Sequence, residues 1–245
     1  MLAKFFSHGV QIALSTGRLF HYTEPVAEML GLPVHYLCAD GAHILPNGYQ
    51  RPIVNSLPSP LVREVMRLLS DHLDAIYLLL TDGIWCSDQK RVNTQILGWG
   101  NYLVTHEFGP EEAITALQIV CLIEKDEAKG VFDLLRKTFP DLEIEINRSL
   151  DPAYDQIVIR PHGINKGSGL ETLAKILKIE IEETLVFGDW INDIPMLLKA
   201  GLSVAPTGSV TEVKKAADII SEFTNDQDFV GRELQRLLVE KKITA

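Results

Sequence analysis

The sequence predicts an α/β fold: a doubly wound parallel-sheet core with an inserted α+β module. At both ends of the 245-residue chain, short apolar strands alternate with helices, which is the rhythm of a parallel sheet covered by helices. Between residues 46 and 159 strands dominate instead, as they do in α+β modules. We therefore expect a core domain made of residues 1–45 and 160–245, with residues 46–159 inserted into it.

The N-terminal segment is predicted to hold two strands with a helix between them, over residues 10–15, 22–32 and 34–38. The first strand ends in Thr16-Gly17-Arg18, and the second ends at Asp40-Gly41. Ligands of open α/β sheets bind just beyond the carboxyl ends of the strands. These five residues are therefore candidates for a binding site.

The inserted module is predicted to contain two helices and four strands. The helices lie within residues 55–73 and 126–139, and the strands lie over residues 75–81, 116–124, 142–147 and 156–161. Strand 142–147 (LEIEIN) alternates strictly between apolar and polar residues, so we expect one face of this sheet to be wet and to overhang the core. His106 and Arg160 are candidate contacts beside this cleft, although an exposed surface position is the simpler interpretation of each.

The C-terminal segment returns to alternating helices and strands. Helices are expected over residues 167–178, 192–200, 209–216 and 229–240, and strands over residues 184–187, 202–205 and 218–220. Asp189 follows the first of these strands, and Asn192 and Asp193 stand at the start of the next helix. Carboxylate and amide oxygens at this spacing suit Mg²⁺. Asp193 is also well placed to cap the helix, so both interpretations stay open.

Two further residues favour the binding of an anion. Thr16 offers a hydroxyl beside the Gly17 amide, and Lys166 precedes a helix, where an ammonium group suits a phosphate. The alternatives are a turn cap for Thr16 and a solvated surface position for Lys166. The order Lys-Gly-Ser departs from the Gly-Lys-Ser of a Walker A motif, and no GxGxxG dinucleotide fingerprint occurs.

Composition argues against several classes of protein. The net charge is -10 and no block of Lys or Arg occurs, which argues against a nucleic-acid partner. Three scattered cysteines predict neither a disulfide framework nor a zinc site. Apolar runs such as AIYLLL (75–80) are far too short to cross a bilayer, so we expect no membrane partner and a soluble, cytoplasmic protein.

Together these segments resemble the Cof-type subclass IIB of the haloacid dehalogenase (HAD) superfamily of phosphatases. ALSTGR (13–18) is similar to the family's second motif, INKGSGLETLAKIL (164–177) to its third and VFGDWINDIPMLLKAG (186–201) to its fourth. SVAPTGSVTEVKKAADIIS (203–221) resembles the segment that follows. The resemblance covers nearly the whole chain, and it implies a HAD-like, Rossmannoid core with a C2-type cap inserted between the second and third motifs.

The resemblance also implies a function and a set of site residues. The function is a Mg²⁺-dependent phosphatase that hydrolyses a small phosphorylated metabolite, such as a sugar phosphate, through an aspartyl-phosphate. The implied catalytic residues are Lys166 and Thr16. The implied substrate-binding residues are Thr16, Gly17, Arg18, Asp40, Gly41 and Lys166. The implied metal ligands are Asp189, Asn192 and Asp193.

The chain departs from the family in two places. Asp40 stands where the family usually has Asn, which puts the preference for the leaving group in question. The first motif, DxDGT, carries the family's nucleophilic and acid/base Asp residues, but it does not occur here and no Asp precedes Asp40. We expect that motif to belong before Met1, so the 245 residues should be inactive. Strands 10–15 and 184–187, its neighbours in the family, should then be splayed apart or should pair with each other.

Three functions therefore stay open. The first is a phosphatase whose first motif lies upstream of the 245 residues. The second is a non-catalytic member of the same fold that binds a phosphorylated ligand or a protein partner. The third is an α/β protein of another kind that binds a sugar nucleotide or a similar ligand.

Overall fold

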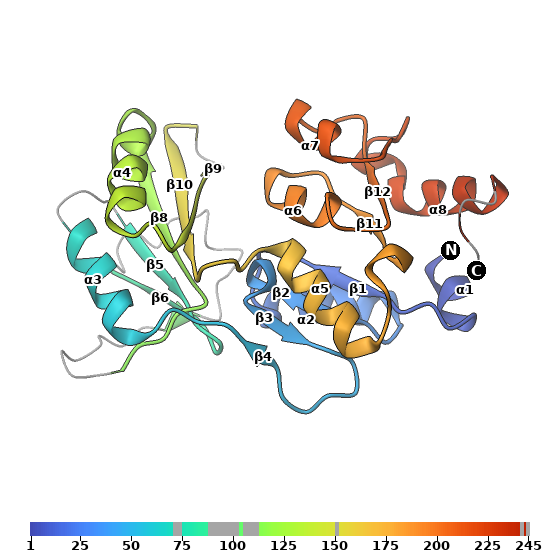
Figure 1. The fold of residues 1–245 in the computed structure, drawn as a ribbon, viewed down its shortest axis with the longest axis horizontal. Coiled ribbons are helices and arrows are strands. Elements are labelled where there is room, and N and C mark those ends of the chain that lie inside the picture. Colours follow the sequence, from blue (N-terminus) through green and yellow to red (C-terminus); the bar gives the residue numbers. More distant parts are fainter. Residues whose placement is uncertain (71–74, 88–102, 105–112, 150–151, 241–242, 244–245) are drawn as a thin grey trace.

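The computed structural model describes residues 1–70, 75–87, 103–104, 113–149, 152–240 and 243, and its strands form three sheets (Figure 1). Two sheets lie with the chain ends on one side of the molecule, and a six-stranded sheet lies on the other side. The mixed architecture agrees with the predicted α/β class. Among the helices in these residues, none is both long and apolar enough to cross a membrane.

The N-terminal segment forms a four-stranded sheet in the order β1-β2-β3-β4, preceded by helix α1 (Leu2–Ser7). Its strands are β1 (Ala13–Ser15), β2 (His35–Cys38), β3 (His43–Leu45) and β4 (Ile53–Val54). β1 and β2 are parallel and are connected through helix α2 (Phe20–Leu30), as the βαβ pattern predicted. β3 pairs antiparallel with β2, and β4 pairs antiparallel with β3. Neither strand was predicted, because both are too short to show a clear alternation.

The C-terminal segment forms a parallel three-stranded sheet with helices on both faces, as expected for a doubly wound core. The strands are β11 (Leu185–Phe187), β12 (Leu202–Ala205) and β13 (Ile219–Ile220). Helices α5 (Lys166–Leu177), α6 (Ile194–Leu197) and α7 (Thr211–Ala216) share an apolar cluster with Val186 and Ala205. Helix α8 (Phe229–Val239) packs with Phe187 and Val204, whose side chains point to the opposite face.

Strands β1 and β11 each have a neighbour on only one edge among the described strands. β1 pairs with β2 and β11 pairs with β12, so the parallel core consists of two separate sheets. Ala13 is exposed, and the Ser15 hydroxyl is buried without a hydrogen-bond partner among the described residues. Of the two expected arrangements, the strands therefore adopt the splayed one, and each keeps a row of free backbone groups.

The middle of the chain forms a six-stranded sheet in the order β7-β6-β5-β8-β10-β9. Its strands are β5 (Ala75–Leu79), β6 (Ile84–Cys86), β7 (Leu103–Val104), β8 (Gln118–Glu124), β9 (Glu143–Arg148) and β10 (Tyr154–Arg160). Helices α3 (Ser59–Leu69) and α4 (Lys125–Thr138) cover its outer face (Figure 1). Ile76, Ile119 and Ile157 lie on that face, in one apolar cluster with both helices.

The inner face of this sheet was expected to be wet, and that expectation is wrong for β5, β8 and β10. Leu79, Val120 and Val158 are buried there and share an apolar cluster with Leu19 and Ala42 of the N-terminal segment. The strict alternation that predicted a wet face belongs to β9 alone. Its neighbours carry apolar residues on both faces, which is typical of strands that are covered on both sides.

His43 is a buried titratable group in β3. It is 6% exposed, and neither ring nitrogen has a hydrogen-bond partner among the described residues. Burial lowers the pKa of the imidazole, and nearby His21 lowers it further. The unfolded chain protonates His43 near pH 6.5, whereas the folded protein keeps the ring neutral to lower pH. This ring therefore favours folding above pH 6.5, and that contribution is lost as the pH falls below 6.5.

We expect the melting temperature to fall as the pH is lowered from about 7.5 to about 5.5, with up to ~1.4 kcal/mol lost per pH unit for this group. His43→Leu removes the titrating ring from the same buried position and should flatten the dependence. His162→Gln, at an exposed position, should keep the wild-type slope. Thermal melts of the three proteins at several pH values provide the measurement. Equal slopes for wild type and His43→Leu would contradict this account.

Candidate functional site

Thr16 and Asp40 lie together at the carboxyl ends of β1 and β2. The Thr16 amide donates to the Leu37 carbonyl at 2.9 Å, and the Asp40 amide donates to the Thr16 carbonyl at 3.0 Å. The Thr16 hydroxyl accepts the Arg18 amide at 3.1 Å, so its own proton remains available for another acceptor. A Cβ atom on Gly17 would lie 3.3 Å from the Asp40 carboxylate, so this turn fits closely against that carboxylate.

The turn after β2 packs directly against the start of helix α5. Gly41 has a φ of 91°, and a Cβ atom there would lie 2.7 Å from the Asn165 carbonyl oxygen. Only glycine accommodates both this conformation and this approach. The Asn165 side chain accepts the Ser168 amide at 3.0 Å, and the Ser168 hydroxyl is bonded to the Asn165 amide at 3.0 Å, which forms a capping box. The first residue of the helix, Lys166, is thereby held beside the ends of the strands.

Lys166 and Asp193 form a buried ion pair. Their side chains are 7% and 6% exposed, and the Lys166 ammonium donates to Oδ1 of Asp193 at 2.6 Å. The other carboxylate oxygen, Oδ2, accepts the amides of Asp189 and Trp190 at 2.9 Å each. Asp193 therefore fastens the turn after β11 and holds Lys166, whereas its side chain makes no capping hydrogen bond to helix α6, so the helix-cap interpretation is wrong. The surface position that was an alternative for Lys166 is excluded.

The predicted metal ligands have different surroundings. The Asp189 side chain is exposed, and its Oδ2 accepts the Asn225 side-chain amide at 2.8 Å. The Asn192 side-chain amide donates to Asp40 at 2.9 Å. Both oxygens of Asp193 already have partners. Among the described residues, no three His, Cys, Asp or Glu side chains are placed to hold a metal ion.

The remaining oxygen donors still suit Mg²⁺. Oδ1 of Asp189 and the side-chain carbonyl of Asn192 are hard oxygen ligands at the same strand end. Proteins commonly hold Mg²⁺ through one or two carboxylates, while waters and phosphate oxygens complete the coordination. The donor set therefore fits this metal as part of a site that a phosphate would complete.

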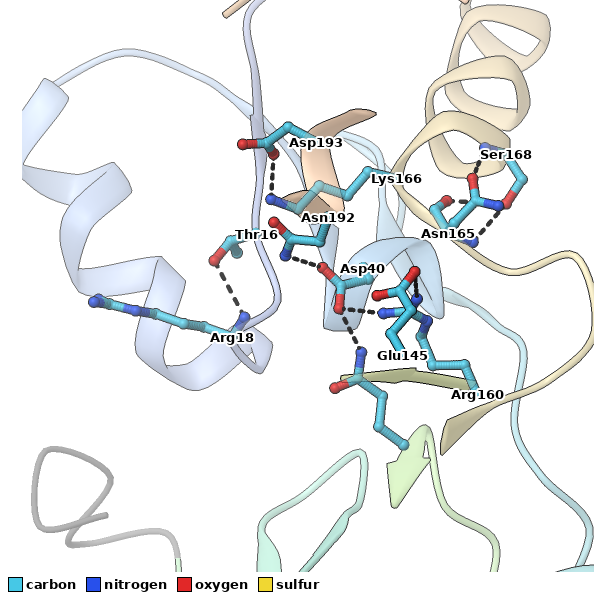
Figure 2. A network of polar contacts seen from close by, with 11 residues as sticks. Thr16, Arg18, Asp40, Glu145, Arg160, Asn165, Lys166, Ser168, Asn192 and Asp193 are labelled. Carbon is cyan, nitrogen blue, oxygen red and sulfur yellow. Dashed lines mark hydrogen bonds and ion pairs between the residues drawn. The ribbon is translucent and has the colours of Figure 1, made fainter. Parts of the chain in front are cut away.

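A polar network centred on Asp40 joins the three sheets (Figure 2). Oδ2 of Asp40 accepts hydrogen bonds from Gln118 of β8 at 2.9 Å and from Arg160 of β10 at 2.8 Å. Oδ1 accepts the bond from Asn192, in the 3₁₀ turn η5 (Ile191–Asp193) that follows β11. Arg160 also forms an ion pair with Glu145 of β9. One carboxylate thus contacts elements that are far apart in the sequence.

Arg160 is 1% exposed, so the surface interpretation of this residue was wrong. Burial by itself would lower the pKa of the guanidinium, but the carboxylates of Asp40 and Glu145 outweigh burial and raise it. The group therefore remains a permanent cation. Sequence reasoning missed Gln118 and Glu145, although the alternation of β9 placed Glu145 on one face of the sheet. Only the pairing register shows that Arg160 shares that face.

The structure brings together most of the predicted site residues at the facing ends of β1, β2 and β11: Thr16, Gly17, Asp40, Gly41, Lys166, Asn192 and Asp193. Two others, Arg18 and Asp189, are exposed, the first in the turn after β1 and the second just after β11. His106 lies outside the described residues. The site therefore presents a cation, a hydroxyl and hard oxygen donors at one place, a combination that suits a phosphate group.

Comparisons with known proteins identify relatives of this chain. The chain is 26% identical over 228 residues to the 5-amino-6-(5-phospho-D-ribitylamino)uracil phosphatase YcsE of Bacillus subtilis (strain 168), covering 93% of this chain and 82% of the relative. It is 23% identical over 262 residues to the HMP-PP phosphatase of Serratia proteamaculans (strain 568), covering 100% and 89%. The crystal structure of a haloacid dehalogenase-like hydrolase from Bacteroides thetaiotaomicron is similar with a TM-score of 0.79 at 23% identity, covering 96% of this chain and 89% of that one.

The family described as haloacid dehalogenase-like hydrolase matches residues 1–234, which is nearly the whole chain. The match includes the segments 13–18, 164–177 and 186–201, on which the resemblance was based. The chain therefore belongs to the haloacid dehalogenase-like hydrolase family.

Proposed function

We propose that the protein is a phosphatase-type hydrolase that acts on a small phosphorylated metabolite, with a sugar phosphate as the substrate class. The observation that carries the proposal is the buried Lys166 ammonium at the carboxyl ends of the strands. Its partner Asp193 follows Asn192, which bonds to Asp40, and the Asp40 amide bonds to Thr16. Two relatives named above are phosphatases, and the name of one includes a phosphorylated ribityl chain. We extend this substrate chemistry to the present chain and propose sugar phosphates as its substrates.

Each phosphate contact has a physical basis in the fold. The Lys166 ammonium keeps two protons beyond the one it donates to Asp193, and it stands at the N-terminal end of a 12-residue helix that favours anions. The Thr16 hydroxyl and the Gly17 amide supply uncharged donors from the opposite strand. Asp193 positions Lys166 and does not touch the phosphate, because both of its oxygens are already occupied.

Asp189 and Asn192 are the proposed protein ligands of a Mg²⁺ ion, with Asp193 contributing by holding their turn in place. When bound, the ion would neutralise phosphoryl oxygens. The protein side chains would orient the phosphate between Thr16 and Lys166.

The chemical step needs a nucleophile and a proton donor that the described site does not contain. We propose that both are carboxylates of a first-motif strand that pairs between β1 and β11, whose free edges end at this site. One carboxylate forms a bond to phosphorus as the bond to the leaving oxygen breaks, and the second protonates that oxygen. Water then attacks the aspartyl-phosphate and releases phosphate. Residues 46–159 form the proposed cap, which excludes other water from the site.

The described site is also compatible with a second function, because the donors of Lys166 and Thr16 could hold a phosphate whether or not it is cleaved. A member of this family that binds a phosphorylated ligand without hydrolysing it would fit the same site. Activity measurements separate this function from the first.

A fusion tests the proposed activity. We expect the 245 residues alone to leave p-nitrophenyl phosphate intact with Mg²⁺ present. A segment of about 20–30 residues with a DxDGT strand, taken from a relative and fused before Met1, is long enough for a strand, a turn and the start of a helix. This fusion should hydrolyse the ester, because it supplies both carboxylates and the missing strand pairing.

The matched control is the same fusion with both motif Asp residues changed to Asn, which keeps the strand and removes the chemistry. Release of p-nitrophenol by the 245 residues alone would show that the nucleophile lies within them. A folded but inactive fusion that still binds phosphate would favour the non-catalytic function.

Lys166→Gln should weaken the binding of inorganic phosphate at least tenfold, because it removes a charged hydrogen-bond donor worth about 1.5–3 kcal/mol. The amide of Gln keeps a donor for Asp193, which limits the loss of stability. Isothermal titration calorimetry with inorganic phosphate provides the measurement. Lys175→Met, at an exposed position of the same helix, is the matched control and should bind phosphate like the wild type. Unchanged affinity in Lys166→Gln would remove Lys166 from the phosphate site.

Magnesium binding by the 245 residues should be weak, in the millimolar range, because Mg²⁺ needs several anionic oxygens to offset its dehydration. Asp189→Asn should abolish what binding there is, whereas Asp141→Asn, an exposed residue outside the site, should not change it. Calorimetry with MgCl₂ measures both variants. Micromolar binding that depends on Asp189 would show that the site is already complete without a first-motif strand.

A further inference from the structure

The loop that precedes helix α8 places a side chain on the candidate metal ligand Asp189. The side-chain amide of Asn225 donates to Oδ2 of Asp189 at 2.8 Å, although 36 positions separate the two residues in the sequence. Asn225 begins the 3₁₀ turn η6 (Asn225–Gln227), which lies between β13 and α8. Both side chains are exposed, so the contact lies where an ion from solvent can reach it.

The loop of residues 221–227 is anchored independently of this contact. The Ser221 amide donates to the Ala205 carbonyl of β12 at 2.8 Å, which fastens the loop to the sheet. The Ser221 hydroxyl accepts the Phe223 amide at 3.0 Å and donates to the buried carboxylate of Glu233, in α8, at 2.6 Å. The loop therefore has a fixed position without the bond from Asn225 to Asp189, and fastening the loop does not explain that bond.

Asp189 is held both at its backbone and at one carboxylate oxygen. Its amide donates to Oδ2 of Asp193 at 2.9 Å, and its own Oδ2 accepts the bond from Asn225. Among the described residues, Oδ1 of Asp189 has no hydrogen-bond partner. An exposed carboxylate can normally rotate, but one that is held at both places presents its second oxygen in a single direction.

The same arrangement occurs at the second candidate ligand, Asn192. A carboxylate only accepts hydrogen bonds, so the Asn192 amide nitrogen faces Asp40 and its carbonyl oxygen points away from that contact. Each candidate ligand therefore has one atom bound by a residue from a distant segment and one hard oxygen left over. Partners of this kind orient metal ligands in proteins, and their loss weakens metal binding.

Asn225 holds the Asp189 carboxylate without neutralising it. A lysine or arginine in its place would also donate a hydrogen bond, but its positive charge would repel a metal cation. The amide of asparagine is neutral, so Asp189 keeps its full negative charge for an ion. The chemistry of Asn225 thus suits a partner of a metal ligand better than an ion pair would.

We propose that Asn225 is a positioning residue for the Mg²⁺ site, which binds Oδ2 of Asp189 and thereby directs Oδ1 toward the ion. The inference rests on the proposed function, since it assumes that Asp189 is a ligand of the ion. Asn225 itself does not contact the metal. It lies outside the segments on which the resemblance was based, and only the tertiary structure places it beside Asp189.

Binding of Mn²⁺ to the 245-residue protein tests this role. Mn²⁺ prefers the same oxygen ligands as Mg²⁺, and its electron paramagnetic resonance signal measures the free ion directly. Protein and ion are mixed at concentrations near the millimolar dissociation constant that we expect for the site. Wild type should bind the ion, and Asp189→Asn should abolish the binding.

Asn225→Leu removes the donor while keeping the approximate size of the side chain. It should weaken Mn²⁺ binding about tenfold, as expected when a metal ligand loses the partner that orients it. The melting temperature and the affinity for inorganic phosphate should stay at the wild-type values, because the loop keeps its other anchors and Lys166 is held separately. Asn47→Leu makes the same change at an exposed position of the N-terminal segment and is the matched control.

The Asp189→Asn variant separates this inference from the proposed metal site. If it loses Mn²⁺ while Asn225→Leu binds as tightly as wild type, the positioning role is wrong and the metal site stands. A lower melting temperature or a parallel loss of phosphate binding in Asn225→Leu would show a merely structural role and would also overturn the inference. If wild type does not bind Mn²⁺, or Asp189→Asn binds it equally well, the proposed metal site fails, and the role of Asn225 fails with it.

Discussion

The carboxylate of Asp40 is the contact on which the arrangement of the site depends. It accepts hydrogen bonds from β8, β10 and the turn after β11, and its own amide is bonded to Thr16. A buried carboxylate is costly unless it is paired and fully hydrogen-bonded, and Asp40 meets both conditions. Loss of this one group would leave the Gln118 and Asn192 amides and one nitrogen of the Arg160 guanidinium without their acceptor. It would also release the contacts that hold the three sheets to one another at the site.

The Lys166–Asp193 pair is a second buried ion pair, and it lies at the proposed phosphate site. Asp193 also fastens the turn after β11 through two amides. The position of the ammonium is therefore determined by the backbone of a neighbouring strand end and not by solvent. This pre-organisation would favour the proposed binding of phosphate, because the lysine does not need to lose conformational freedom when the ligand arrives. The capping box of Asn165 and Ser168 at the start of α5 holds the backbone of Lys166 in place.

The division of the parallel core into two sheets gives this fold an unusual feature at its centre. In a compact α/β domain the central strands normally have neighbours on both edges, because unpaired backbone groups are costly when buried. Here β1 and β11 each have one neighbour, and Ala13 in β1 is exposed. The two sheets are held together by helix α5 and by the side-chain contacts of Asp40 and Lys166. A strand that paired in parallel with both edges would bring its carboxyl end to the proposed phosphate site.

The sequence alone predicts the fold class and the family, because both depend on local patterns of residues. The βαβ rhythm predicted the doubly wound core, and the segments around Thr16, Lys166 and Asp189 indicated the family and a candidate site. The roles of Gln118, Glu145 and the buried Arg160 were decided only by the tertiary structure. Their spacing in sequence says nothing about which carboxylate they meet, since a contact between β10 and the turn after β2 depends on sheet register and on how the sheets pack. The same reason explains the wet face that was wrongly predicted from β9: alternation in one strand does not reveal what covers its neighbours.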